Sequence, residues 1–394
     1  MDAAFGVFES LEAPTGAEED WRYVNRDMSL TGLAPILEPG APLPAGPFLA
    51  SVEATSGAVL IVDGAVLEAS SAEAAVTRLG ESDGEVAFSS TPADHNKLAA
   101  AHTAFAGDAA LVDVAAGQVM ESPLVVEVQG VTPGTVSFPH IAVSVGEGAE
   151  AQILVVYRSA EGAPLLMVPE VSLRVAAGAR LRCLSVQGLD PRGAVVTHQR
   201  MKLGRDATGR LGEVGLGGEL GRLDLGVSLE GDGSSSEVVG LYFGEGAQTL
   251  DYRMVINHSG RGTTSDILLK GAVEDEAESV FTGLLRIEEG AAGASTFETN
   301  RNLVLSGAAK AHSVPNLEIL CDDVVCGHGS SVGPLEAEQL YYLRSRGLST
   351  QRAERLLVKG FFQEIIDRLP IRGVEAPVSE EVLSRFEHAQ GRPA

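Results

Sequence analysis

The chain has 394 residues, of which 54 are acidic and 29 basic, giving a formal net charge of −25. A surface this negative repels nucleic-acid phosphates and anionic membranes, so we expect neither as a partner. No apolar run approaches the roughly 18 residues that span a bilayer, and the first residues lack the basic and apolar regions of a signal peptide. Three cysteines are too few for a disulfide framework, which favours a cytoplasmic protein.

The first part of the chain, residues 1–107, is expected to be a mixed region of short helices and strands. Thr15 and Glu18 have the spacing of a capping box, which predicts the start of a short helix. Residues 58–67 predict a β-hairpin, because their central Asp-Gly pair suits a tight two-residue turn. Residues 94–105 place apolar side chains at helical spacing and predict a longer helix.

Short β-rich runs separated by glycines fill residues 108–333, which we expect to form the core. One shape recurs there: an apolar, a polar and an apolar residue, often followed by two small or polar residues and Gly. The second apolar residue returns every 26 to 31 positions, at Val114, Val145, Val175, Leu203 and Leu229. Strands that return at this pace predict the stacked coils of a parallel β-helix, although a β-sandwich with regular turns would give a similar pattern.

The last part, residues 334–394, is expected to be a helical domain. Pro334 and Gly347 suit the start and the stop of a first helix. A second helix is predicted to end before Pro370 and to bury one face. That face consists of Ala353, Leu356, Leu357, Phe361 and Ile365. Ser379, followed by two glutamates, predicts the start of a third helix.

The densest group of metal-ligand side chains lies near residue 326. Cys326 and His328 are two apart, so an extended strand would point both side chains to the same face. Thiolate sulfur and imidazole nitrogen are good ligands for iron, but two ligands do not complete a site. Cys321 would face the opposite side of an unbroken strand, and Cys183 is typical of a core strand. A buried thiol beside a structural histidine is the alternative interpretation of the pair.

No catalytic constellation is predicted elsewhere. His95 and His102 lie on one expected helix but are seven apart, without an H-E-x-x-H pattern, and the remaining histidines are scattered. The chain contains neither a nucleophile elbow nor a phosphate-binding P-loop, so we expect it not to bind ATP itself. The sequence therefore favours a protein that is not an enzyme.

Five segments closely resemble the C-terminal signature of the SufB/SufD family of iron–sulfur cluster assembly proteins. They are residues 300–306, 312–319, 322–329, 331–335 and 340–347. Within that family, the run from Cys326 to Gly333 resembles the SufD form. Gly327 departs from the usual Ser or Thr, and Glu298 from the usual Gln, but neither change removes a ligand-type side chain.

The resemblance implies a right-handed parallel β-helix flanked by helical N- and C-terminal regions. It implies two partners, a SufB-like scaffold and a SufC-like ATPase, and a transient iron–sulfur cluster shared with the SufB-like chain. His328 matches the functional histidine of SufD proteins, and Cys326 its neighbouring cysteine. From their helix positions, Leu340, Tyr341, Arg344 and Arg346 are the expected contacts for the ATPase. The pattern allows a homodimer of the isolated chain and makes no prediction about a flavin.

Two other functions compete with this interpretation. The chain could support a SufB-like partner as a purely structural subunit, without touching iron. A β-helix carbohydrate-active enzyme is the other alternative, but it predicts paired acids along one face of the coils, and acidic groups such as residues 274–276 first suggest solvated turns.

Overall fold

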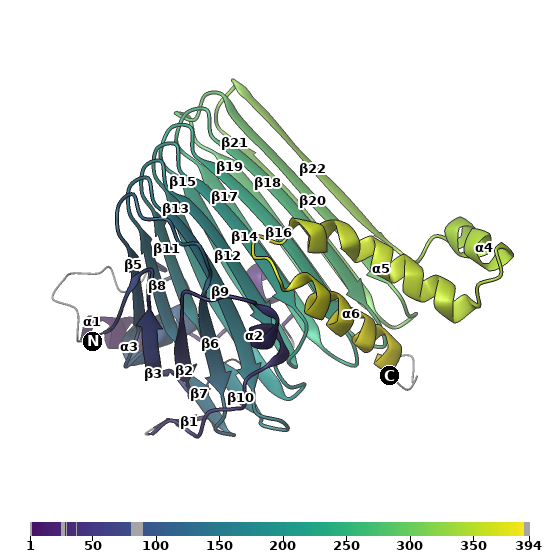
Figure 1. Ribbon diagram of the computed structural model, residues 1–394, viewed down its shortest axis with the longest axis horizontal. Helices are drawn as coiled ribbons and strands as arrows, with labels where there is room; N and C mark the ends of the chain where they lie inside the picture. The colour runs from purple at the N-terminus through teal and green to yellow at the C-terminus, as the bar shows by residue number, and fades with distance from the viewer. Residues whose placement is uncertain (1, 25–27, 29, 37, 80–89, 390–394) are drawn as a thin grey trace.

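The protein is a two-sheeted parallel β-solenoid of about eight turns with helices at both ends of the chain. This computed structural model describes residues 2–24, 28, 30–36, 38–79 and 90–389. Figure 1 shows the coils stacked side by side, with the early strands at one end and β21 and β22 at the other. The expectation of a mostly β parallel β-helix with terminal helices is confirmed.

Two sheets form the walls of the solenoid. The first has twelve strands. In spatial order its main path is β21 (Lys310–Ile319), β19 (Glu278–Ile287), β17 (Thr249–His258), β15 (Leu220–Leu229), β13 (Gly193–Leu203), β11 (Glu170–Val175), β8 (His140–Val145), β5 (Ala110–Val114) and β4 (Ala75–Arg78), with β1 (Ala34–Pro35), β7 (Thr135–Ser137) and β10 (Leu165–Met167) beside it.

The second sheet has ten strands. Their order is β22 (Val324–Gly333), β20 (Ala294–Val304), β18 (Thr264–Val273), β16 (Ser235–Gly244), β14 (Thr208–Gly215), β12 (Arg180–Gln187), β9 (Glu150–Ser159), β6 (Leu124–Gly130), β2 (Gly57–Val62) and β3 (Ala65–Ser71). The pairs are parallel except β2 with β3 and β4 with β5. Consecutive long strands alternate between the two sheets, which is how one chain winds both walls.

The repeated positions of the sequence are register partners on neighbouring strands of the first sheet. Val114 pairs with Val145, and Val145 with Val175. Leu203 and Leu229 continue the same ladder. All five side chains are buried in the lumen between the sheets. The 26-to-31-residue period is therefore one coil of the solenoid, and each coil stacks an apolar side chain on the one before it.

At one corner of each successive coil, a residue adopts the left-handed backbone conformation. Gly117, Gly148 and Gly178 have φ angles of 73°, 67° and 64°. Asp206 takes the equivalent place in the next coil with a φ of 55°, and Gly233 follows with 71°. Because glycine adopts this conformation without steric cost, the recurring glycine of the sequence motif closes the corner.

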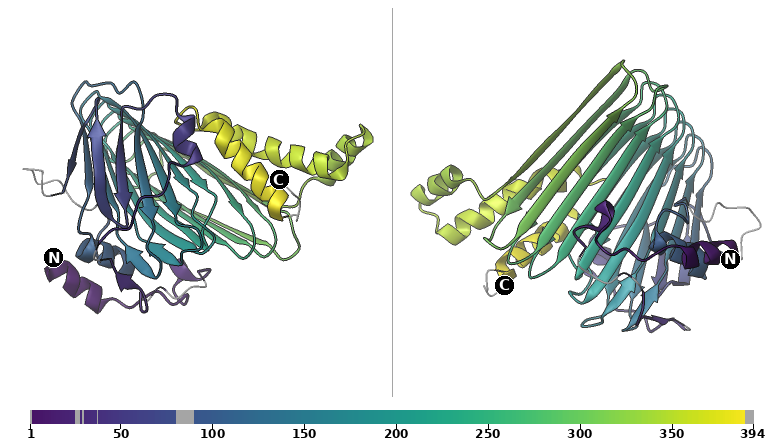
Figure 2. Two further views of the ribbon diagram at one scale, coloured as in Figure 1. Left: turned by 60° about the horizontal axis from the view of Figure 1, so that its bottom comes forward. Right: turned by 180° about the vertical axis from the view of Figure 1, so that it is seen from behind.

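Helices cover the outer faces of the two sheets. On the first sheet lie the 3-10 turn η1 (Glu19–Trp21) and α3 (Lys97–Phe105), and α1 (Asp2–Ser10) packs against α3. On the second sheet lie α2 (Pro47–Ser51), α5 (Thr350–Arg368) and α6 (Glu375–Ala389), whereas α4 (Ala337–Ser345) projects away. Figure 2 shows the N-terminal and C-terminal helices on different sides of the solenoid. Within the described part of the chain, no helix is long and apolar enough to cross a membrane.

Most of the expected local elements are present. The hairpin is formed by β2 and β3, with Asp63 and Gly64 at φ angles of 51° and 91°. Thr15 and Glu18 form the predicted capping-box contact, in which the Thr15 backbone N–H donates to Glu18 Oε2 at 3.0 Å. Only a 3-10 turn follows, in place of the expected short helix. The last helix begins at Glu375, so its predicted start at Ser379 is four residues late.

The predicted buried face of α5 is partly wrong. Ala353 and Ile365 are buried as expected, but Leu356 is 48% exposed. The α5 side chains in the apolar cluster on the second sheet are Val358, Phe362, Ile365 and Ile366, and the partly buried Phe361 packs against it. This helix has apolar residues on two of its sides, so helical spacing alone could not identify the side that packs against the sheet.

Gly178→Ala should lower stability by about 1–2 kcal/mol, because an L-residue at this φ brings its Cβ against the backbone. Apart from Gly178 itself and its two neighbours in the chain, no atom lies within 4 Å of the added Cβ. The unfavourable backbone conformation is therefore the only cost of the substitution. Gly188→Ala is the matched control, since it also meets no atom within 4 Å but has no positive φ. Thermal unfolding measures both variants, and equal midpoints would contradict the assignment of the corner.

Candidate functional site

The solenoid is open at its C-terminal end. β21 pairs only with β19, and β22 only with β20, so each is an edge strand among the described residues. Figure 1 shows β22 as the outermost strand of this end. Six large apolar side chains of the last coils are more than a third exposed: Phe297, Leu317, Ile319, Leu320, Val325 and Val332. Unpaired strand edges and exposed apolar groups mark this end as a surface for another chain.

Cys326 and His328 lie on this outermost strand and share one face, as predicted. In the parallel register Cys326 pairs with Thr296, and His328 with Glu298. Thr296 and Glu298 are buried, at 0% and 2% exposure, and point into the lumen. Their partners on β22 therefore point to the lumen side of the last coil, where no further coil covers them. The His328 side chain is exposed and open to an incoming ligand.

Cys321 precedes β22 and does not lie on an unbroken strand with Cys326. The expectation that it faces the opposite side is wrong, because a bend at Asp322 and Asp323 precedes β22 and ends the strand alternation. Cys321 and Cys326 instead pack against the same apolar cluster of Ile287, Ala291 and Ala294. Both thiols are partly buried and free of disulfides. Cys321, Cys326 and His328 all lie at the open end, but among the described residues they are not a group whose donor atoms lie within 4.8 Å of one another.

Cys183 has no part in this site. It lies on β12 with 1% exposure, as the sequence predicted for a core strand residue. Burial raises the pKa of its thiol far above the ordinary value, and the nearby Glu213 carboxylate adds to the effect. A thiol that stays protonated in a closed core is a poor metal ligand.

Glu298 lies on β20 as the register partner of His328, and its carboxyl group is buried. Its side chain fills the space above Gly283, where a Cβ would collide with the carboxyl group. Oε2 has no hydrogen-bond partner among the described residues. Burial raises the pKa of Glu298 to about 7, so the group can take up or release a proton near neutral pH. A glutamine at this position could not do so.

The expected partner residues lie on or beside α4. This helix has no buried residue, and Tyr341 is 76% exposed. Leu340 is half-buried, and Arg344 is exposed. Arg346 follows the helix and places its guanidinium 5.4 Å from the ring centre of Tyr342, a neighbour that the sequence analysis did not single out. Figure 1 shows α4 standing clear of both sheets.

A groove connects α4 and α5 with the open end. Its volume is about 880 Å³. Ser330 and Val332 of β22 line one side, and Leu356 and Phe361 of α5 line the other. Leu356, Leu357 and Phe361, three of the five side chains expected in the core, therefore line this groove. The groove places the helical surface and the edge strand within one continuous region.

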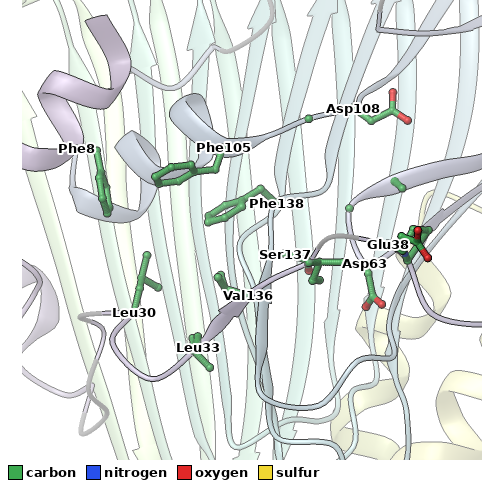
Figure 3. Close-up of a pocket in the computed structure, with 15 residues that line it drawn as sticks. Phe8, Leu30, Leu33, Glu38, Asp63, Phe105, Asp108, Val136, Ser137 and Phe138 are labelled. Atoms are coloured by element: carbon green, nitrogen blue, oxygen red, sulfur yellow. The ribbon is translucent and has the colours of Figure 1, made fainter. Parts of the chain in front are cut away.

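A second hollow, of about 640 Å³, lies near the N-terminal helices (Figure 3). The aromatic side chains of Phe8, Phe105 and Phe138 line one side of it, and Asp63 and Asp108 lie farther along. Asp63 accepts a hydrogen bond from the backbone N–H of Val131 at 2.8 Å, and Asp108 from that of Val66 at 3.0 Å. Both carboxylates hold turns, and the hollow brings together no nucleophile and base among the described residues.

The expectation that the other histidines form no constellation is wrong. His102, His140 and Glu170 form one buried group, and a second group lies beside it on the same sheet. The second group consists of His95, His198 and Asp224. His140, Glu170, His198 and Asp224 lie on four adjacent strands in one register row, so their spacing in the sequence follows the coil period and no short motif shows it.

Comparison with known proteins points to one family. A family model described as the SUF system FeS cluster assembly, SufBD core domain matches residues 128–361. An iron–sulfur cluster assembly SufBD family protein of Mycobacterium leprae is 32% identical over 394 residues, covering 98% of this chain and 92% of that protein. The iron–sulfur cluster assembly protein SufD of Escherichia coli is 30% identical over 260 residues, covering 66% of this chain and 60% of that protein. SufD of Bacillus subtilis is 40% identical over 148 residues, covering 38% of this chain and 34% of that protein.

Glu298→Gln should stabilise the protein increasingly as the pH rises. A carboxyl whose pKa is raised from 4.5 to about 7 binds more protons when folded, so its ionisation opposes folding between these values and above. The increase in the free energy of unfolding caused by Glu298→Gln should approach about 3 kcal/mol at pH 8 and vanish below pH 4.5. Thermal unfolding from pH 4.5 to 8 measures the difference.

The control for this series is Glu289→Gln, which changes an exposed carboxyl in a turn of the same region. Because this side chain is exposed, the replacement should change stability by no more than about 0.5 kcal/mol. A Glu298→Gln gain that is constant over the same range would show that Glu298 ionises normally.

Proposed function

Because this chain belongs to the SufBD family of SUF-system iron–sulfur cluster assembly proteins, we propose that it is a cytoplasmic scaffold subunit of the SufD type. It pairs with a SufB-like chain, docks a SufC-like ATPase and carries out no enzymatic step of its own. The observation that carries the proposal is the open end of the solenoid, where the edge strand β22 presents both Cys326 and His328 on a face that no other described strand covers.

The open end is suited to pairing with a second β-solenoid. β21 and β22 each have ten residues, and each offers one unpaired edge. A SufB-like chain with the same architecture could continue both sheets across the junction. The backbone hydrogen bonds would supply affinity, and the exposed apolar side chains of the last coils would be removed from water.

The iron–sulfur cluster is the cargo at this junction. His328 offers an imidazole nitrogen and Cys326 a sulfur, which are the donor types that iron–sulfur chemistry uses. These two residues leave a four-coordinate site incomplete, and the SufB-like chain would contribute the remaining ligands. An incomplete site at an interface also allows release, because separating the two chains removes half of the ligands.

The C-terminal helices provide the connection to the ATPase. Leu340, Tyr341, Arg344 and Arg346 form the docking surface, and ATP binds to the SufC-like subunit. A displacement of α4 would reach the second sheet through α5. Lys270 Nζ on β18 bonds the Phe361 carbonyl at 2.8 Å and Glu364 at 2.7 Å.

A second set of ion pairs fastens the end of α5. Arg368 pairs with Glu237 on β16 at 2.7 Å and with Asp266 on β18 at 2.6 Å. These pairs hold the helix to strands that lie two and three places from β22 in the sheet. Movement of the ATPase subunits would thereby open or close the junction.

Co-expression with a SufB-like and a SufC-like chain should yield one stable assembly that contains all three. Size-exclusion chromatography with light scattering measures its mass and so separates the complex from a homodimer of this chain. A chain that elutes without either partner would contradict the scaffold function.

His328→Ala should leave the complex intact and lower the yield of assembled cluster. The side chain is exposed on an edge strand, so its removal costs little stability. Iron and sulfide content of the purified complex measures the yield, and His388→Ala, which removes an exposed histidine of α6, is the control.

The Cys326→Ala/His328→Ala double variant separates the iron-ligating subunit from a purely structural one. A wild-type iron content in this variant would mean that the chain supports its partner without ligating iron. A loss of iron with the complex intact supports ligation.

Tyr341→Ala should weaken the association with the SufC-like ATPase by more than about tenfold, as expected for an exposed aromatic anchor at an interface. A pull-down titration of the ATPase measures the change. Phe5→Ala removes another exposed ring, on α1, and should leave the affinity unchanged. Equal affinity for both variants would place the docking surface away from α4.

A further inference from the structure

His102, His140 and Glu170 come together from three elements of the fold. His140 on β8 and Glu170 on β11 are register partners in the first sheet, and His102 reaches them from α3, which covers this face. Their exposures are 0%, 0% and 1%. Two imidazoles and a carboxylate are thus gathered in a closed space between α3 and the solenoid wall.

The spacing of the donor atoms fits a metal ion. One donor atom from each residue lies within 4.8 Å of the other two. His102 Nδ1 and Glu170 Oε2 are 3.4 Å apart. Two ligands bound tetrahedrally to Zn²⁺ at roughly 2.0–2.1 Å are about 3.4 Å from each other. The pair already has the separation that an ion between them would require.

The surroundings orient two of the donors toward this space. His102 Nε2 lies 3.2 Å from the Pro139 carbonyl oxygen and donates its proton there, which leaves a lone pair on Nδ1. Oε1 of Glu170 accepts from the backbone N–H groups of Ser90 and Thr91 at 2.8 and 3.1 Å. Glu170 therefore turns its other oxygen toward His102. Outer hydrogen bonds of this kind fix the ligands in protein metal sites.

The third donor residue lies against the first. The ring centres of His102 and His140 are 5.1 Å apart, and a ring nitrogen of each lies within 4.8 Å of a Glu170 carboxylate oxygen. A neutral imidazole binds a metal through its lone pair, so one cation among the three residues would be shared by all of them.

We propose that His102, His140 and Glu170 bind one divalent transition-metal ion, of the Zn²⁺ or Fe²⁺ type, which fastens α3 to the solenoid. Two nitrogens and one oxygen are a donor set that both ions accept. The site lies on the outer face of the first sheet and is separate from Cys326 and His328 on the second, so it is a structural site rather than a place for the cargo.

The neighbouring group is already occupied by its own partners. Asp224 accepts from His95 at 2.5 Å and pairs with Arg200 at 3.1 Å. His198 Nε2 lies 3.2 Å from the side-chain amide of Asn96. A guanidinium beside the carboxylate supplies the positive charge that a metal would bring. This group therefore serves as the matched control.

The test uses the full chain with Cys321→Ser, Cys326→Ser and His328→Ala, so that the open end cannot bind the probe. The protein is stripped with a chelator and titrated with Co²⁺, whose visible d–d absorption reports ligand geometry. We expect about one Co²⁺ per chain, without thiolate charge-transfer bands, and a higher thermal midpoint in the loaded protein. Competition with Zn²⁺ and with Fe²⁺ identifies the ion that the site prefers.

Glu170→Gln in this background should weaken Co²⁺ binding by more than about 100-fold, which exceeds the usual effect of an outer hydrogen bond. Asp224→Asn should bind Co²⁺ as tightly as the parent. A parent protein that binds no stoichiometric Co²⁺ overturns the proposal without reference to any variant. So does a folded Glu170→Gln protein that binds as tightly as the parent, or an Asp224→Asn protein that alone loses binding.

Discussion

The structure depends on the in-register stacking of parallel strands. Each coil places an apolar side chain directly on the one before it, as Val145 does on Val114 and Val175 on Val145. Every interior strand has both backbone edges paired, whereas the last strand of a sheet cannot. A solenoid of this kind must either cap its ends or use them.

The two ends of this solenoid differ. At the N-terminal end, β2 with β3 and β4 with β5 form antiparallel pairs that end the two sheets. At the C-terminal end, no described strand covers β21 or β22, and the lumen-facing positions continue into Cys326 and His328. The uncapped end therefore coincides with Cys326 and His328, the two residues that we propose to ligate the cluster.

The helices do more than cover the sheets. α5 is held to the second sheet by Lys270 and Arg368, whereas α4 has no buried residue. A firmly attached helix beside a projecting one suits the transfer of movement from a bound partner to the strands. On the first sheet, α3 brings His102 onto the row of His140 and Glu170, so the N-terminal region is joined to the solenoid by polar as well as apolar contacts.

Much of the fold could be predicted from the sequence because its signals are local or periodic. The Asp63-Gly64 turn, the glycine corners and the period that links Val114 to Leu229 depend on backbone conformation and side-chain alternation. The Cys326 and His328 pair was predictable for the same reason, since two residues two apart on a strand share a face.

Only the tertiary structure decided which distant residues meet. A bend before β22 placed Cys321 with Cys326, and the choice between two apolar sides of α5 was made by the sheet against which it packs. His102, His140 and Glu170 are separated by 38 and 30 residues, so stacking of coils and docking of a helix were needed to gather them. The sequence by itself determined the coil, its corners and the face of each strand, because these follow from neighbouring residues. The contacts between coils, helices and the open end depend on packing across the whole chain, which no short pattern contains.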